Sequence, residues 1–419
     1  MRRVNELTYI KEKGKLLKHA EKQLSIASTK DKNIALEKIA QSIENNRLEI
    51  LKANEVDIKN GRDNNMSEAL IDRLALDNNR LDSILEGINT VIKLPDPIWQ
   101  SNKVWTLENG LTISQMATPL GVIGIVYESR PNVTVDAFSL ALKSGNCIIL
   151  RGSSSAINSN KALVKAIKEG LKTSPISEDV VQFVEDTNRD LVLDMLKANE
   201  YIDLIIPRGG RNLIQFVINN STVPTLQTGE GNCHLFIDES ADLNKAVDIL
   251  VNAKTQRLGV CNACETLLVH ENIKDKFLPL AYDAIRDKIE LRGCTITKEI
   301  IDIKLATEED YKEEYLDAIL AVKVVKDVEE AINHINKYGT KHSEAIVTES
   351  LTNANKFQRQ VDASSVYVNA STRFTDGAEF GFGAEMGIST QKIHARGPVG
   401  LEQLTTYKYL VIGEGQIRE

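Results

Sequence analysis

Val122-Ile123-Gly124-Ile125-Val126 and Cys147-Ile148-Ile149-Leu150 are two short apolar runs, and residues 133–142 between them follow a helical pattern. Short runs rich in β-branched residues are typical of strands that are buried on both faces of a sheet. A strand, a helix and a second strand in this order indicate parallel strands joined by a right-handed crossover. This segment therefore predicts a doubly wound α/β fold.

The same alternation of strand and helix continues along the chain. Further strands are expected at residues 180–184, 202–206, 234–237, 266–269, 319–325, 345–348 and 365–369. Helical patterns separate them, for example at residues 161–171, 191–196 and 213–218. Two α/β domains are therefore expected.

The N-terminal part and the end of the chain differ from this alternation. Residues 5–93 have apolar positions at helical spacing, with Asp31 as an expected helix cap, and Pro95 ends the pattern. An Asn109-Gly110 turn between two β-prone runs predicts a hairpin over residues 104–118. Residues 404–412 alternate Thr and Tyr in a way that suits an edge strand.

Composition narrows the class of protein. The 419 residues carry a net charge of -8 and contain no long basic block, which argues against a nucleic-acid partner. No uninterrupted apolar stretch approaches the ~18 residues of a membrane span, and no apolar signal segment begins the chain. The odd count of 5 cysteines favours thiols in a reducing compartment, so a cytoplasmic protein is expected.

The stretch Gly259-Val260-Cys261-Asn262-Ala263-Cys264-Glu265-Thr266 places a thiol in a polar turn just before an expected strand. A cysteine acts as a nucleophile when it is partly exposed in a positive local field. The alternative is a small buried apolar residue, the commonest role of a free cysteine. A zinc site needs further ligands that the sequence does not offer, so no metal is expected and Cys264 is interpreted as incidental.

Several loops after expected strands have features of anion sites. Gly209-Gly210 opens a helix, where backbone N–H groups can meet an anion, and Arg151 is followed by Gly152 and Ser153. Ordinary turns and helix caps are the alternatives at both places. Glycine-rich residues 377–387 lead to Lys392, His394 and Arg396, which form either an anion site or a solvated surface.

Six segments resemble, in this order, motifs of the aldehyde dehydrogenase superfamily. They are residues 121–133, 143–152, 229–234, 259–263, 344–348 and 380–400. Within the superfamily the resemblance is to the branch that acts on L-glutamyl 5-phosphate, and it spans nearly the whole chain. It implies NADPH-dependent reduction of this acyl phosphate to L-glutamate 5-semialdehyde, through a cysteine thioester, in proline biosynthesis.

The resemblance also implies roles for particular residues. Cys261 is the expected nucleophile and Asn132 an oxyanion-stabilising amide. NADPH is expected to contact Arg151, Ser153, Gly209, Gly210 and Glu314. Of these, Arg151 is expected at the 2′-phosphate and Glu314 at the nicotinamide ribose. The expected contacts to the substrate or its phosphate are Arg130, Lys392, His394 and Arg396.

A three-part architecture follows from the same resemblance. Residues 1–103 and 119–228 are expected to bind NADP, and residues 229–370 to form the catalytic domain. Residues 104–118 and 371–419 are expected to supply an oligomerisation hairpin, a glycine-rich active-site loop and a C-terminal strand. A homo-oligomer is the expected assembly.

Gln227 departs from the superfamily in an informative way. Relatives that hydrolyse their thioester carry a glutamate at the corresponding place, and glutamine cannot act as a base. Glutamine at this position fits an acyl-phosphate substrate, because hydrolysis of the thioester by water would prevent its reduction to the aldehyde. The alternatives are a hydrolytic NAD(P)-dependent aldehyde dehydrogenase and a catalytically silent relative. Because acyl phosphates are labile, transient contact with a glutamate 5-kinase is a further hypothesis.

Overall fold

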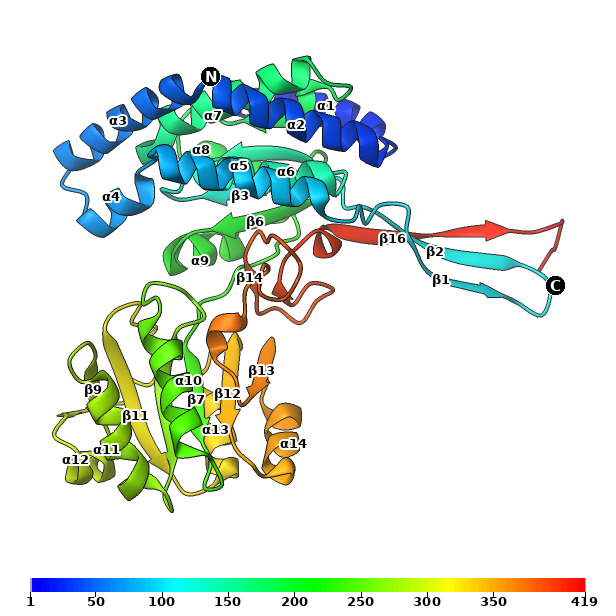
Figure 1. The fold of residues 1–419 in the computed structure, drawn as a ribbon. Coiled ribbons are helices and arrows are strands. Elements are labelled where there is room, and N and C mark those ends of the chain that lie inside the picture. The colour runs from blue at the N-terminus through cyan, green and yellow to red at the C-terminus, as the bar shows by residue number, and fades with distance from the viewer. Residues whose placement is uncertain (1, 419) are drawn as a thin grey trace. The chain divides into compact units, whose positions relative to one another are not determined.

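The computed structural model describes residues 2–418 and consists of two compact units. The first unit comprises the chain up to Gln227, Gly381–Gly387 and the residues from Val399 onward. The second comprises Thr228–Phe380 and Ile388–Pro398. Each unit is a parallel sheet covered by helices, which confirms the predicted α/β class (Figure 1). No described helix is both long and apolar enough to cross a membrane.

The first unit is built on a four-stranded parallel sheet with the order β5-β4-β3-β6. Its strands are β3 (Val122–Tyr127), β4 (Cys147–Arg151), β5 (Val181–Phe183) and β6 (Leu204–Arg208). Its helices are α6 (Asn132–Lys143), α7 (Ile157–Lys172), α8 (Asp190–Leu196) and α9 (Arg211–Asn220), with short turns η1 (Ser154–Ala156) and η2 (Glu178–Val180). The predicted strands are confirmed, because each is an apolar run buried on both faces.

The order of these strands creates a switch point in the sheet. The chain moves outward from β3 to β4 and β5, and then returns to place β6 on the other side of β3. The carboxyl ends of β3 and β6 therefore open into a crevice, where doubly wound sheets bind ligands. The loops after Tyr127 and Arg208 lie at this crevice.

The N-terminal part of the chain is helical, as the sequence predicts. Its helices are α1 (Arg2–Leu24), α2 (Thr29–Asn45), α3 (Arg47–Asp63), α4 (Glu68–Leu74) and α5 (Asn78–Lys93). Helix α1 packs on strands of the first sheet. Helices α2 and α3 pack on α7, and α5 packs on α6. The prediction that Asp31 caps a helix is wrong. Ser28 is the cap of α2, because it precedes the first turn and its hydroxyl accepts the Asp31 N–H.

A three-stranded antiparallel sheet completes the first unit. Strands β1 (Ser101–Thr106) and β2 (Thr112–Pro119) form the predicted hairpin, and β16 (Thr405–Ile412) pairs with β2 after the turn η4 (Glu402–Leu404). Gly110 in the hairpin turn has a φ of 87°, a conformation that favours glycine. The outer faces of β1 and β16 are largely exposed, although Trp105 and Tyr409 pack edge to face.

The second unit is built on a seven-stranded sheet with the order β10-β9-β11-β8-β7-β12-β13, in which every pair is parallel. The strands are β7 (Cys233–Ile237), β8 (Cys264–His270), β9 (Glu290–Gly293), β10 (Lys304–Leu305), β11 (Ile319–Val325), β12 (Ser343–Val347) and β13 (Ser365–Val368). The five predicted strands are confirmed. The sequence missed β9 and β10, which are short and carry charged residues. A separate pair, β14 (Ile388–Ser389) and β15 (Gly397–Pro398), is antiparallel.

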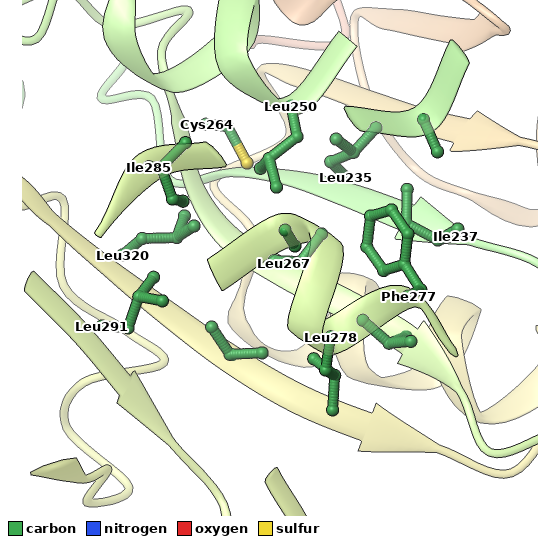
Figure 2. Close-up of a cluster of buried hydrophobic side chains, with 14 of the residues drawn as sticks. Leu235, Ile237, Leu250, Cys264, Leu267, Phe277, Leu278, Ile285, Leu291 and Leu320 are labelled. Atoms are coloured by element: carbon green, nitrogen blue, oxygen red, sulfur yellow. The ribbon is translucent and has the colours of Figure 1, made fainter. Parts of the chain in front are cut away.

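Helices cover the seven-stranded sheet. They are α10 (Leu243–Thr255), α11 (Lys274–Ile285), α12 (Thr295–Ile300), α13 (Val328–Tyr338) and α14 (Leu351–Gln360), with a short turn η3 (Thr372–Phe374). One core joins Leu250 and Phe277 of the helices to Leu235, Leu267 and Leu320 of the strands (Figure 2). Burial of each such side chain stabilises the unit by about 1.5–3 kcal/mol.

Candidate active site

Cys261 and Cys264 lie at the entrance to β8 in different surroundings. Cys261 is partly exposed in the turn that joins α10 to β8. Cys264 is the first residue of β8, fully buried among the side chains of the core (Figure 2). Burial raises the pKa of the Cys264 thiol to about 12. Of these two thiols, only that of Cys261 is therefore accessible to a substrate.

The loop before β7 touches the Cys261 turn at Gly231. A Cβ atom on Gly231 would lie 1.4 Å from the Cys261 carbonyl oxygen, so glycine alone permits the approach. The Gly231 N–H donates to the Glu314 carboxylate at 2.7 Å. Burial raises the pKa of Glu314, and the Gly231 N–H opposes that shift. Cys261 and Glu314, two predicted site residues, are thus brought together through one glycine.

Cys233 lies behind the Cys261 turn in a buried polar network. Its thiol donates to the Cys261 carbonyl oxygen at 3.2 Å and lies 3.8 Å from His342 Nδ1. Burial raises the pKa of Cys233 and lowers the pKa of His342 to about 4, so both groups are neutral near pH 7. This network orders the turn but adds no positive charge to it.

Arg373 is a residue of the site that the sequence analysis missed. Its guanidinium donates to the side-chain oxygen of Asn262, the residue after Cys261. The Asn262 amide donates in return to the carbonyl oxygens of Arg373 and Thr375, at 3.2 and 2.9 Å. Thr372 donates to the Asn262 carbonyl at 2.8 Å. Four hydrogen bonds therefore fasten residues 372–375 to the Cys261 turn across more than 100 residues of sequence.

A buried ion pair supports the same turn from α10. Lys254 Nζ lies 2.6 Å from Glu265 Oε2, and both side chains are fully buried. Leu316 N–H also donates to the Glu265 carboxylate at 3.2 Å. Burial raises the pKa of Glu265, and the Lys254 ammonium opposes that rise. The pair fixes the direction in which the chain leaves the turn and enters β8.

In the first unit, Arg130 and Asn132 lie at the switch point. They line a cavity of about 50 Å³ together with Asp136, Arg208 and Glu385. The Asn132 amide donates to Asp136 Oδ2 at 2.9 Å. Burial raises the pKa of Asp136 to about 6, while Asn132 and Arg208 oppose that rise. The structure thus brings Arg130 and Asn132 together, and Asn132 already uses its amide on a carboxylate.

Arg151 ends β4 and is followed by a group of serine hydroxyls. Its guanidinium donates to the carbonyl oxygens of Gly152 and Thr187, at 2.8 and 3.1 Å. Its Nε is buried and has no hydrogen-bond partner among the described residues. Ser153 Oγ lies 2.5 Å from Ser155 Oγ, and Ser129 lies beside both. An unpartnered guanidinium N–H at the end of β4, followed in the chain by the serine hydroxyls, fits a phosphate-bearing cofactor.

The glycine pair after β6 is already bound to an acidic side chain. Gly210 N–H donates to Glu128 Oε2 at 2.9 Å. A Cβ atom on Gly209 would lie 2.6 Å from the Glu128 carboxyl carbon. Gly209 and Gly210 therefore lie between β6 and α9, and the Gly210 N–H at the start of α9 is hydrogen-bonded to the Glu128 carboxylate.

Lys392 and Arg396 are held by one carboxylate. Lys392 Nζ and Arg396 Nη2 each lie 2.8 Å from Asp362, and Lys341 Nζ lies 3.3 Å from it. These cations hold the pKa of Asp362 well below its usual range. His394 is exposed in the same loop. Among residues 2–418, no group of three or more His, Cys, Asp or Glu side chains is arranged to hold a metal ion.

Comparison with known proteins defines the class of this fold. A family model described as the aldehyde dehydrogenase family matches residues 15–292 and 292–410. An acetylating aldehyde dehydrogenase from Geobacillus thermoglucosidasius has the same fold, with a TM-score of 0.71 at 16% identity over 99% of both chains. The chain belongs to the aldehyde dehydrogenase family.

Its similarity to one group of that family extends over the whole chain. The chain is 63% identical to the gamma-glutamyl phosphate reductase of Alkaliphilus oremlandii, over 99% of this chain and 100% of the relative. The crystal structure of gamma-glutamyl phosphate reductase from Thermotoga maritima matches with a TM-score of 0.96 at 55% identity, over 99% and 100% of the two chains. These findings confirm the resemblance seen in the sequence.

Proposed function

We propose that this protein reduces L-glutamyl 5-phosphate to L-glutamate 5-semialdehyde with NADPH and releases phosphate, a step of proline biosynthesis. The full-length similarity to gamma-glutamyl phosphate reductases carries the proposal. The partly exposed Cys261, in a turn ordered by Gly231 and Asn262, supplies the chemistry that such a reaction needs.

Cys261 is the proposed nucleophile. Its thiolate attacks the acyl carbon, a C–S bond forms, and the C–O bond to phosphate breaks with phosphate taking the electron pair. Backbone N–H groups of Cys261 and Asn262 are proposed to hold the oxyanion, a contribution of about 3 kcal/mol per donor. NADPH, when bound, supplies the hydride that reduces the thioester. Breakage of the C–S bond then releases the aldehyde and returns the Cys261 thiolate.

The first unit is proposed to hold the cofactor. Arg151 and Ser153 present an unpartnered N–H and a hydroxyl at the end of β4, where a 2′-phosphate is expected. Arg189, which the sequence analysis missed, adds a second positive charge near Arg151. Gly209 and Gly210 are proposed to face the cofactor at the switch point, and Glu314 the nicotinamide ribose.

The remaining sequence predictions also stand as proposals. Asn132 is a candidate for stabilising the oxyanion. Arg130 and the loop of Lys392, His394 and Arg396 are candidates for binding the substrate or its phosphate. The exposed strands β1 and β16 are proposed to join copies of the chain into a homo-oligomer. Transient contact with a glutamate 5-kinase and a cytoplasmic location are proposed as well.

The reverse reaction tests the proposed function. Glutamate 5-semialdehyde and NADP⁺ are mixed with the protein, with and without inorganic phosphate, and the reduced cofactor is followed by absorbance. We expect reduction that depends on phosphate. Reduction at the same rate without phosphate would contradict the proposal and would indicate a hydrolytic dehydrogenase.

A further inference from the structure

Arg373 is bonded to both ends of the segment that carries Cys261, and Arg257 belongs to that segment. The Arg373 guanidinium donates to Asn262 Oδ1 and, at 2.9 Å, to Gln256 Oε1. Gln256 directly precedes Arg257, and Asn262 directly follows Cys261. The acceptors that fix Arg373 are therefore neutral amides, one on each side of the turn. These two acceptors orient the guanidinium and carry no charge of their own.

The two positive charges act on each other. Arg373 is partly buried, and its pKa is lowered first by burial and then by the nearby Arg257, while Asp376 and Cys261 oppose the shift. Two like charges in a partly desolvated place repel, and an anion between them relieves the repulsion. These positive charges lie in the segments that carry and support the proposed nucleophile, although the net charge of the chain is -8.

The cations of the Asp362 cluster provide a contrast in the same unit. Lys341, Lys392 and Arg396 lie within 3.3 Å of one carboxylate, so their charge is partly neutralised inside the protein. Arg373 makes its hydrogen bonds with amides instead. Its guanidinium is therefore hydrogen-bonded to neutral acceptors, and the nearby Asp376 acts on it through charge and not through a hydrogen bond.

We propose that Arg373 and Arg257 bind the phosphate group of the acyl-phosphate substrate and stabilise it as it leaves. This inference rests on the proposed function. Two guanidinium groups match the double negative charge of a phosphate, and each can bind two of its oxygens. Arg373 is bonded to the residue that follows Cys261, and the phosphate is attached to the carbon that the sulfur attacks. The α-carboxylate, with a single charge, lies at the far end of the substrate.

The first test measures the charge around Cys261 without any turnover. The rates at which iodoacetate (an anion) and iodoacetamide (neutral) alkylate Cys261 are compared by peptide mass spectrometry. We expect Arg373→Lys to keep the iodoacetate-to-iodoacetamide ratio of the wild type within about twofold. We expect Arg257→Met to lower it by about threefold or more, because one of two nearby charges is removed. An unchanged ratio in Arg257→Met would overturn the proposal.

The second test separates the phosphate from the carboxylate. In the reverse reaction, Arg257→Met and Arg373→Lys are expected to raise the KM for inorganic phosphate by about tenfold, the loss of one charge-assisted hydrogen bond. The KM for the semialdehyde should change by less than about twofold. A rise in the KM for the semialdehyde instead would assign the arginines to the carboxylate, and unchanged KM values for both would remove them from the site. Either result overturns the proposal.

Arg286 provides a matched control for the loss of one arginine charge. Arg286→Met makes the same change at an exposed arginine of this unit, whose ion pair is with Asp283, and should leave both KM values unchanged. Arg257 is exposed, so Arg257→Met is expected to fold even if variants of Arg373 do not. Failure of the proposed function is separate, since it would appear in the wild type as reduction without phosphate.

Discussion

Cys261 and Cys264 are the two cysteines of one short segment, and they differ in exposure. The Cys261 thiol is partly exposed, whereas the Cys264 thiol is buried. Cys264 begins a strand whose residues are all buried, and its side chain fills part of the core. Cys261 precedes that strand in irregular backbone, held by contact with Gly231 and by bonds to its neighbour Asn262. Cys264 is therefore unreactive because it is buried in a strand, and Cys261 is accessible because it lies in an ordered loop.

The largest expected effect comes from the accessible thiol. Cys261→Ala should lower turnover by at least about 10³-fold, because the proposed thioester forms on the sulfur that this change removes. Its free energy of unfolding should change by less than about 1 kcal/mol, since the side chain is partly exposed. Steady-state assays and urea unfolding measure the two quantities. Turnover close to that of the wild type would remove Cys261 from the mechanism.

The second effect comes from the ion pair that supports the turn. Lys254→Met leaves Glu265 buried without its cation, and the free energy of unfolding should fall by about 3–5 kcal/mol. Lys245→Met, on the same helix, breaks an exposed pair with Glu349 and should lower it by less than about 1 kcal/mol. Urea unfolding of both variants checks the difference. Equal losses would show that burial of the Lys254 pair is unimportant.

Arg151, in the first unit, has a buried Nε–H without a hydrogen-bond partner, and it is proposed to bind the 2′-phosphate of the cofactor. Arg151→Ala should raise the KM for NADPH by about tenfold, the loss of a charge-assisted contact, and should change the KM for NADH far less. Initial rates with the two cofactors measure this difference. Equal effects on both cofactors would contradict a role at the 2′-phosphate.

The buried thiol should give a smaller effect, on stability alone. Cys264→Ala opens a small space in the core, and a loss of about 1–2 kcal/mol in the free energy of unfolding is expected. Its kcat should remain within about twofold of the wild type, because the side chain faces the core. Chemical denaturation and steady-state assays check both. Loss of turnover in a stable Cys264→Ala variant would place this thiol in the chemistry.

The smallest expected effect is on stability and comes from Asp362, whose carboxylate pairs with three cationic side chains. The pKa of Asp362 is lower in the folded protein than in the unfolded chain. The ionised carboxylate therefore stabilises the fold at pH values above its pKa in the unfolded chain, and this stabilisation is lost as the pH falls through its pKa in the folded protein. Asp362→Asn should therefore lower the free energy of unfolding by about 1 kcal/mol at pH 7. The difference from the wild type should shrink below about pH 4. A difference that grows as the pH falls would contradict this sign.

Sequence patterns could predict most of the framework, because a buried parallel strand is a continuous apolar run. The strands around Ile149, Leu235 and Val322 were predicted for that reason. Strand β9 was not, since Glu290-Leu291-Arg292-Gly293 is short and half charged. Ser28 rather than Asp31 caps α2, which depends on where the helix begins and not on residue type alone.

The site was harder to predict than the framework. The Cys261 turn has a local signature, but its supports come from distant parts of the chain. Arg373 reaches Asn262 across 111 positions, and Asp362 reaches Arg396 across 34. Pairings of this kind arise from strand order and loop packing, which a single sequence does not encode locally. The phosphate role expected of the basic loop after Ile388 is accordingly proposed for Arg373 and Arg257.

The most direct test of the central claim is the rate at which each cysteine of the native protein is alkylated by iodoacetamide. Peptide mass spectrometry follows all five thiols while residual activity is assayed in the same samples. We expect Cys261 to react first, Cys233 and Cys264 to stay protected by burial, and activity to fall in step with modification of Cys261. Full activity after complete modification of Cys261 would contradict its role as the nucleophile.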